Sequence, residues 1–237
     1  MYGLWGQSMT EWTPGAALSA YHAGVVIICE LSAQFTPEAW AGPTPCPEWR
    51  AVDLAGHLRC VADNYHEYLD DAPVSLLARL MSASAGPPSL ARKLARQNAA
   101  ELAALPDATG PEHIAAFAAS ARAYALRVVD VWDMPHHHYR DTLVTVGGFV
   151  GAACAEWHLH AWDLARSLGK DYRPATCEVL VAGWQAGMPH LPLEVPVAVG
   201  TCAAAARPGP ATETVGAGHG LAESDSWRVL LRASGRV

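Results

Sequence analysis

Apolar residues recur three or four positions apart along most of the chain, which is the pattern of helices that bury one face. Connections that contain proline and glycine separate these segments, and frequent alanine further favours helix. The predicted helices cover residues 16–34, 51–71, 89–106, 110–132, 142–169 and 174–187. Ser89 is a candidate cap for the third helix, acidic Glu112 favours the start of the fourth, and Gly169 is placed to end the fifth.

Three connections interrupt the helical pattern. Residues 36–50 contain four prolines and are predicted to form a loop, and residues 72–88 form a Pro-, Ser- and Gly-containing connection with room for one short helix. "DMPHHHYRD" (133–141) separates the fourth helix from the fifth. Its histidines at 136–138 are expected to start the long helix or to lie in solvent, and a lip over a neighbouring site is the alternative.

The pattern changes at Leu191. "LPLEVPVAVG" (191–200) and "SWRVLLRAS" (226–234) have the short apolar runs typical of β-strands. The sequence therefore predicts a mainly α protein, a helical bundle with a small C-terminal β-containing appendage. The expected parts are a loosely ordered N-terminus (1–15), the bundle (16–190) and the β-containing segment (191–237).

Composition limits the classes of partner. Of 237 residues, 51% are hydrophobic and 16% charged, which suits a sizeable buried core, and the formal net charge is −7 without a basic block. An acidic chain of this kind disfavours nucleic acid and anionic membranes as partners. We expect small-molecule ligands and a monomer or homodimer.

Cysteine usage and the N-terminus bear on the compartment. The six cysteines are scattered without a C-x-x-C pair, which indicates reduced thiols and a cytoplasmic protein. The most apolar early run, "AGVVIICELSA" (23–33), contains Glu30 and follows His22, so it is not expected to span a membrane. No basic stretch precedes an apolar one at the N-terminus, so no signal peptide is expected.

The stretch "AEWHLHAWDLARSLG" (155–169) carries the candidate chemistry. Glu156 and His160 are four residues apart, about 40° from each other around a helix, and Asp163 stays on that side. His158 is about 200° from Glu156 and points away. Glu156 and His160 are thus a good pair of ligands for zinc or a similar divalent ion.

A third ligand has to come from another helix. His57 lies in the apolar stretch "VDLAGHLRCV" (52–61), and the core of a bundle is where facing helices build metal sites. The alternatives are a buried histidine with a structural role and a local hydrogen bond between Glu156 and His160. From these residues alone, the metal site and its structural alternatives stay open.

Several neighbours have two possible roles. Asp163 either orients a ligand or pairs with Arg166 or Arg122. Asp53, four residues before His57, is expected to stabilise the start of its helix rather than to accept the second N–H of His57. Cys60 and Cys154 lie within a turn of candidate ligands, but buried structural cysteines are the preferred interpretation.

Two segments together resemble a known family. "TPCPEWRAVDLAGHL" (44–58) resembles the Pro-Cys-x-x-Trp loop and Asp-Leu-x-x-His-Leu helix of the mycothiol-dependent maleylpyruvate isomerases, a branch of the DinB-like metal-binding four-helix bundles. "EWHLHAWDLARSLG" (156–169) resembles the second signature of that family, Glu-x-x-x-His-x-Trp-Asp-Leu-Ala followed by Gly. The resemblance spans residues 16–187. Glu48 departs from the more usual glycine, and the C-terminal segment is short.

The resemblance implies an up-down four-helix bundle with a divalent metal, expected to be zinc, held by His57, Glu156 and His160. It also implies mycothiol or another small thiol as cosubstrate. A metal-bound thiol is deprotonated near neutral pH and becomes a nucleophile. The predicted function is therefore attack of this thiol on an electrophilic small molecule, as an isomerase or an S-transferase.

Two other functions remain open at this point. One is a hydrolase in which metal-bound hydroxide attacks instead of a thiol. The other is a non-catalytic ligand-binding or sensor bundle that retains the fold. Arg140, in the connection that enters the ligand helix, is a candidate contact for an anionic substrate, and Asp163 is a candidate supporting residue of the catalytic site.

Overall fold

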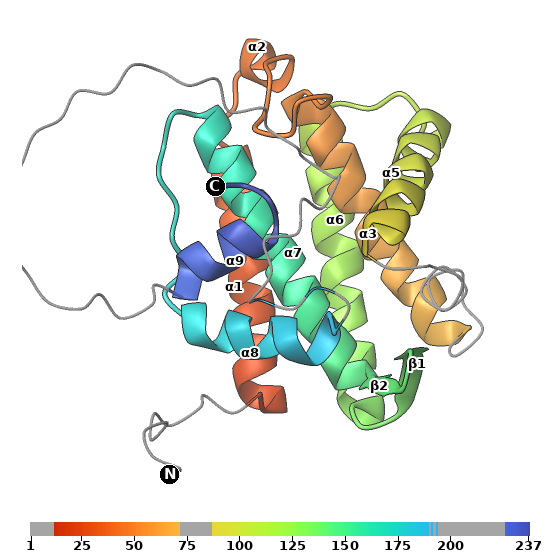
Figure 1. Ribbon diagram of the computed structural model, residues 1–237. Coiled ribbons are helices and arrows are strands. Elements are labelled where there is room, and N and C mark those ends of the chain that lie inside the picture. Colours follow the sequence, from red (N-terminus) through yellow and green to blue (C-terminus); the bar gives the residue numbers. More distant parts are fainter. Residues whose placement is uncertain (1–11, 72–86, 190, 192, 194–225) are drawn as a thin grey trace, which may run out of the picture.

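The computed structural model describes residues 12–71, 87–189, 191, 193 and 226–237, which form a mainly helical fold (Figure 1). The helices are α1 (Pro14–Ser32), α2 (Pro37–Trp40), α3 (Ala51–Asp70), α5 (Pro87–Ala104), α6 (Gly110–Arg127), the 3-10 turn η1 (Val129–Val131), α7 (Val146–Ser167), α8 (Cys177–Gly187) and α9 (Ser226–Ala233). Strands β1 (Pro135–Tyr139) and β2 (Thr142–Thr145) pair as an antiparallel hairpin. The predicted mainly α class is confirmed.

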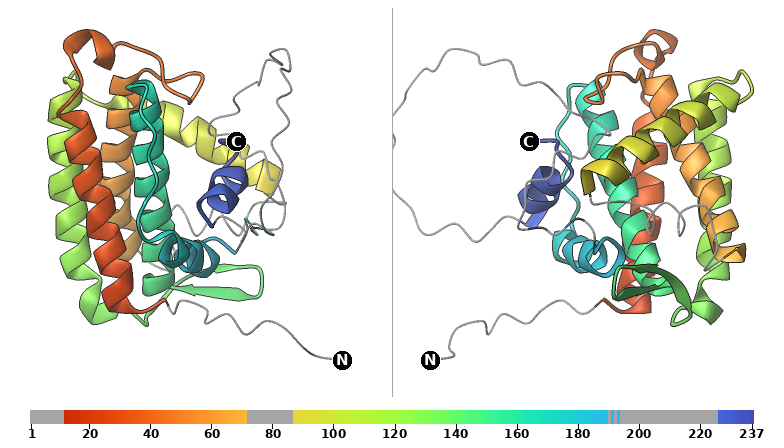
Figure 2. Two further views of the ribbon diagram at one scale, coloured as in Figure 1. Left: turned by 90° about the vertical axis from the view of Figure 1, so that its left-hand side faces the viewer. Right: turned by 45° about the vertical axis from the view of Figure 1, so that its right-hand side comes forward.

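Four long helices, α1, α3, α6 and α7, lie side by side as a bundle (Figures 1 and 2). The starts of α1 and α7 are neighbours, because the Trp12 indole just before α1 donates a hydrogen bond to the Gly147 carbonyl over 2.9 Å. α3 and α6 run in the same direction, because α5 returns the chain between them. Two contacts show this: the His66 ring lies 3.0 Å from the Ser120 carbonyl, and further along both helices Asp70 pairs with Arg127. α5 packs on α3, and α8 packs across α7.

One large side chain from each bundle helix meets the others at the centre. Tyr21, Tyr65 and Phe117 surround Trp157, with ring centroids 5.9, 5.6 and 4.9 Å from the indole, and at most 6% of any of the four residues is exposed. Each such ring contributes about 1.5–3 kcal/mol through burial. This cluster fixes the spacing of α3 and α7, which carry the candidate ligands.

Helix α1 is long and apolar enough to cross a membrane, with 19 residues and a mean hydropathy of 1.4. The run at 23–33, which was not expected to span a membrane, thus belongs to a helix that passes this test by length and composition alone. Core helices of soluble proteins share the same length and composition, and α1 packs against α6 and α7 with 44% of its apolar window buried. Thr13 caps the helix, and Pro14 occupies its first turn.

The hairpin corrects the prediction for residues 136–145. Residues 142–145 are strand β2, so α7 begins at Val146, where the Thr145 hydroxyl accepts the Gly148 N–H over 3.1 Å. His136 and His137 neither start the helix nor lie in solvent: both are buried in β1 and contact the Phe149 ring. The short strand was missed because its alternation runs directly into the apolar start of α7.

The C-terminal prediction of a strand at "SWRVLLRAS" is also wrong, because residues 226–233 form helix α9. Trp227, Leu230 and Leu231 are buried, and their spacing of three and four is the helical period. A short apolar run does not by itself distinguish a strand from a helix, since it fits the period of either element. The other predicted strand, at 191–200, lies outside the described residues except for Leu191 and Leu193.

Two further boundaries differ from the predictions. α5 begins at Pro87, so Ser89 lies inside the helix and does not cap it. The predicted loop at 36–50 contains the short helix α2, which Thr36 caps through a 3.2 Å hydrogen bond from the Ala39 N–H. The N-terminal residues 1–11 and the connection at 72–86 lie outside the described residues.

Candidate metal centre

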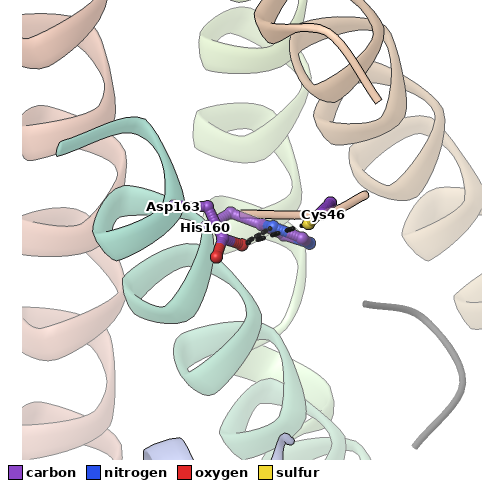
Figure 3. Close-up of side chains that lie close together, drawn as sticks. All are labelled: Cys46, His160 and Asp163. Atoms are coloured by element: carbon purple, nitrogen blue, oxygen red, sulfur yellow. Dashed lines mark hydrogen bonds and ion pairs between the residues drawn. The ribbon is translucent and has the colours of Figure 1, made fainter. Parts of the chain in front are cut away.

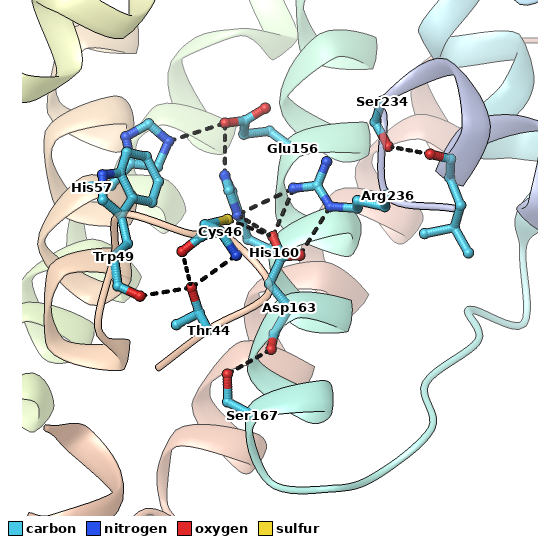
Figure 4. Close-up of polar contacts among 11 residues, drawn as sticks. Thr44, Cys46, Trp49, His57, Glu156, His160, Asp163, Ser167, Ser234 and Arg236 are labelled. Atoms are coloured by element: carbon cyan, nitrogen blue, oxygen red, sulfur yellow. Dashed lines mark hydrogen bonds and ion pairs between the residues drawn. The ribbon is translucent and has the colours of Figure 1, made fainter. Parts of the chain in front are cut away.

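Helices α3 and α7 bring His57, Glu156 and His160 together inside the bundle (Figure 4). Oε1 of Glu156 lies 3.2 Å from Nε2 of His57 and 3.1 Å from Nε2 of His160. One ligand atom from each residue lies within 4.8 Å of the other two. The structure thus places side by side the three residues that the sequence singled out as ligands.

Helix geometry explains the convergence. Glu156 and His160 are one turn apart and project from the same side of α7. His57 lies two turns into α3, on the face that packs towards α7. The His57 and His160 rings meet edge to face with centroids 5.0 Å apart, and each histidine is 4% exposed. The Glu156 side chain is 26% exposed, so the site has an open side at its carboxylate.

The three groups perturb one another electrostatically. Burial lowers the pKa of His57. Burial opposes ionisation of Glu156, yet the His160 charge and hydrogen bonds from both imidazoles hold the pKa of its carboxyl well below the usual range. Burial also opposes the charge on His160, but Glu156 and Asp163 together raise the pKa of its imidazole. Glu156 is therefore held in its carboxylate form between the two histidine rings.

Asp163 orients His160, as one of its two predicted roles requires. Its Oδ2 accepts the Nδ1–H of His160 over 2.8 Å, which leaves Nε2 directed towards Glu156. The cation that pairs with Asp163 is neither Arg166 nor Arg122 but Arg236, which donates from Nε over 3.0 Å and from Nη2 over 2.7 Å. Arg166 pairs instead with Asp171, 2.8 Å away.

Asp53 has the structural role preferred from the sequence. It accepts two side-chain hydrogen bonds and one backbone hydrogen bond from Arg50, all of 2.9 Å, and so completes the cap of α3. It does not orient His57. Within the described part of the chain, the buried Nδ1 of His57 has no hydrogen-bond partner.

The loop before α3 covers the other side of the two histidines. The Trp49 ring packs against the rings of His57 and His160, with centroid separations of 4.6 and 6.4 Å. Thr44 holds this loop: its hydroxyl accepts the Cys46 N–H over 3.0 Å and donates to the Trp49 carbonyl over 2.9 Å. The sequence pattern identified this loop as part of a family signature, and the structure shows its packing against the candidate ligands.

Cys46 lies beside the site, with Sγ 3.7 Å from Oδ2 of Asp163 (Figure 3). The expectation of reduced cysteines holds for Cys29, Cys60 and Cys154 but is wrong for Cys46, which is disulfide-bonded. A disulfide sulfur is not the thiolate that binds metals. The group of Cys46, His160 and Asp163 is therefore a weaker candidate than the first, although its ligand atoms also lie within 4.8 Å of one another.

The remaining candidates lie away from the ligands. His158 points to the opposite side of α7, as expected, with Nε2 2.9 Å from the Ala20 carbonyl and Nδ1 2.5 Å from the Tyr172 hydroxyl. Cys60 and Cys154 are buried, and burial raises the pKa of Cys60 to about 11. Arg140 occupies the turn of the hairpin with φ of 52° and does not line the cavity described next, and its contact with a substrate stays a prediction.

A cavity of about 180 Å³ opens on the Glu156 side of the three ligands. Its walls come from α3, α5, α7, α8 and the C-terminal residues. Its lining residues are His57, Val61, Asn64, Tyr65, Tyr68, Leu94, Gln97, Asn98, Phe149, Ala152, Glu156, Leu159, His160, Trp184, Gly187, Met188, Leu191, Ser234 and Arg236. The cavity could not be predicted from the sequence, because its walls combine separate segments of the chain.

The donor set fits a divalent cation. Two imidazole nitrogens and one carboxylate oxygen are ligands that zinc accepts, and three protein ligands with an open side are typical of catalytic rather than structural zinc sites. Asp163 supplies the outer hydrogen bond that commonly orients a ligating histidine. The residues therefore suit a metal that binds a small molecule in the adjoining cavity.

Comparisons with known proteins agree with this arrangement. Residues 22–165 match the sequence model described as the mycothiol maleylpyruvate isomerase N-terminal domain. The match begins within α1 and ends within α7, so it includes all three candidate ligands. No curated protein and no solved structure is significantly similar to the chain.

Proposed function

Since the chain belongs to the family of mycothiol maleylpyruvate isomerase N-terminal domains, we propose that it is a metal-dependent enzyme that activates a small thiol. The thiol is mycothiol or a close relative, and it attacks an electrophilic small molecule. The convergence of His57, Glu156 and His160 at the wall of a cavity is the observation that carries this proposal.

Three residues would bind the metal, and a fourth would orient one of them. His57, Glu156 and His160 would hold the cation, expected to be zinc, and Asp163 would keep Nε2 of His160 available by accepting the proton on Nδ1. A divalent cation held there would supply Lewis acidity that lowers the pKa of a thiol in the cavity, so that no separate protein base would be needed. Trp49 packs over the two imidazoles and limits access of water from the loop side.

The cavity determines what reacts. Aromatic and aliphatic side chains from α7 and α8 form its apolar wall, including Phe149, Leu159 and Trp184. Such a wall suits a small electrophile with a conjugated carbon skeleton, of which maleylpyruvate is the example in the family name. If the added thiol leaves again, the product is the other geometrical isomer; if it stays, the product is a thioether and the enzyme is an S-transferase.

The partners and compartment follow from the same chemistry. We propose small molecules as the ligands and the cytoplasm as the compartment, where a small thiol is kept reduced. The net charge of −7 gives no attraction to nucleic acid or to an anionic membrane surface. A monomer or homodimer is sufficient, since one chain supplies all three ligands.

A thermal-shift matrix of metals crossed with thiols tests the proposal. Zinc should raise the unfolding midpoint, and mycothiol should raise it further only when zinc is present, because a ligand that binds the folded state stabilises it. Turnover of maleylpyruvate should then require both metal and thiol. Turnover that needs metal but no thiol would favour a metal-hydroxide hydrolase, and stabilisation without turnover of electrophiles would favour a binding protein.

A further inference from the structure

One wall of the cavity is polar and uncharged, unlike the rest. Asn64 and Tyr68 lie one turn apart on α3, and Gln97 and Asn98 face the same cavity from α5. The opposite wall, from α7 and α8, carries the apolar side chains described above. A ligand that fills the cavity therefore meets hydrogen-bonding groups on one side and apolar surface on the other.

The amide donors of Gln97 and Asn64 already have hydrogen-bond partners, while acceptors are left over. Nε2 of Gln97 donates to Oε1 of Glu101 over 2.6 Å and to the Tyr68 hydroxyl over 3.3 Å, and Nδ2 of Asn64 donates to the same Glu101 oxygen over 3.0 Å. Turning the Gln97 amide over would place its oxygen against the Glu101 carboxylate, so the observed orientation is the favourable one.

Two buried oxygens consequently remain without a hydrogen-bond partner among the described residues: Oε1 of Gln97 and Oε2 of Glu101. A buried acceptor without a partner costs about 1–3 kcal/mol. Among the described residues, the hydrogen-bond partners of Glu101 are neutral amides, and its carboxylate lies behind Gln97 and Asn64. Both features favour a ligand that brings hydrogen-bond donors, such as hydroxyl or amide N–H groups, and disfavour an anionic one.

Helix geometry gives the separation of this wall from the metal ligands. Asn64 is seven residues after His57 on α3, which is about 10 Å along the helix axis at 1.5 Å per residue. Gln97 lies beside it on α5, since both side chains contact Glu101. A ligand that reaches both ends of the cavity has to extend over that distance.

We propose that Asn64, Gln97 and Asn98 form a subsite that binds hydroxyl or amide N–H groups at the non-reacting end of the thiol. This inference rests on the proposed function, because the thiol end is placed at His57, Glu156 and His160. The subsite selects a long thiol with a donor-rich, uncharged end over a short one. It therefore determines which thiol the protein accepts, while the metal determines how that thiol reacts.

A comparison of two thiols tests the subsite. Calorimetric titration of the zinc-loaded protein would use mycothiol, which carries a polyhydroxylated sugar–cyclitol end, and N-acetylcysteine, which lacks it. We expect mycothiol to bind at least tenfold more tightly. Gln97→Leu should weaken mycothiol binding by about tenfold, the effect of one lost hydrogen bond in a buried site, and should change N-acetylcysteine binding by less than twofold.

Two companion variants separate recognition from folding. Asn98→Ala shortens a lining amide that has no hydrogen bond to another described residue, so it should lower only mycothiol affinity and leave the unfolding midpoint unchanged. Arg96→Ala, at an exposed position on the same helix, should change neither thiol. Equal binding of both thiols, or equal losses for both in Gln97→Leu and Asn98→Ala, would overturn the subsite alone. Failure of the wild-type protein to bind either thiol would overturn the proposed function and the subsite with it.

Discussion

Arg236, the second-last residue of the chain, forms a two-point ion pair with Asp163 in the middle of helix α7. Only 7% of the Arg236 side chain and none of the Asp163 side chain is exposed. Asp163 in turn accepts a hydrogen bond from His160, one of the candidate ligands. The C-terminal residues are thus attached to the candidate metal centre through the Asp163 carboxylate, and Nη2 of Arg236 also lies 3.4 Å from Nδ1 of His160 (Figure 4).

Arg236→Ala should destabilise the protein by about 3 kcal/mol, because removing one partner of a buried ion pair leaves the other charge uncompensated. Denaturant unfolding monitored by circular dichroism measures the loss. Arg166→Ala provides the matched control, since its pair with Asp171 is exposed and such pairs contribute about 0–1 kcal/mol. Equal effects of the two substitutions would show that the Arg236 pair contributes no more than a surface pair.

Helical periodicity was sufficient to predict that Glu156 and His160 share one side of α7 and that α3 is buried, because both follow from spacing along one element. The Arg236–Asp163 pair was missed, since 73 residues separate its members and closer arginines were available as alternatives. Spacing within one helix cannot predict a contact between two helices. The expectation that His57 of α3 lies beside Glu156 and His160 of α7 came from the resemblance of two motifs to the family.

The missed elements have a common cause. β2 and α9 are short, and each carries an apolar run that fits either a strand or a helix. Tertiary packing decides between them: Trp227, Leu230 and Leu231 are buried only with the helical period. The polar wall around Gln97 was not predicted either, because it depends on how α5 packs against α3.

Replacing a candidate ligand should abolish metal binding, and replacing Asp163, which orients His160, should lower the affinity for the metal. We expect His57→Ala and His160→Ala to lose stoichiometric zinc after reconstitution, and Asp163→Asn to lower zinc affinity by about 10–100-fold, as removal of an outer hydrogen bond to a ligand commonly does. Competition with a chromophoric chelator measures the affinity. His22→Ala, an exposed histidine substitution on α1, should retain wild-type affinity; retained affinity in His160→Ala would contradict the assignment of the site.

The protein should lose stability in mild acid through the buried pair in the hairpin. Burial lowers the pKa of His136 to about 3 and that of His137 to about 4, and their Nδ1 atoms share a hydrogen bond of 2.8 Å that two protonated rings do not form. The unfolded chain binds these protons more readily than the folded one. Stability is therefore complete above about pH 6.5 and falls as the pH decreases towards 4, by about 1.4 kcal/mol per pH unit for each histidine.

Urea unfolding at pH 7, 6 and 5 checks this slope. In His137→Asn the decrease should be less steep by about 1.4 kcal/mol per pH unit, because His136 and His158, whose pKa values burial lowers to about 3 and about 4, still contribute. His138→Asn, at an exposed position of the same strand, should keep the wild-type slope. A His137→Asn slope equal to that of the wild type would assign the acid sensitivity to other groups.

The crossing of α7 and α8 leaves no room for a side chain at Gly151. A Cβ placed there would lie 2.1 Å from the Gly183 carbonyl oxygen, which is backbone and does not move aside as a flexible side chain would. Gly151→Ala should therefore destabilise the protein by about 1–3 kcal/mol, the usual cost of overpacking, despite the higher helix propensity of alanine.

Gly15→Ala in α1 supplies the opposite case, since a Cβ there meets nothing within 4 Å. That substitution should stabilise by at most about 1 kcal/mol, because only propensity changes. Thermal unfolding of both variants distinguishes the two effects. A Gly151→Ala midpoint at or above the wild-type value would contradict the prediction and show that α8 moves away from α7 at little cost. The cavity wall formed by Trp184 and Met188 would then move together with α8.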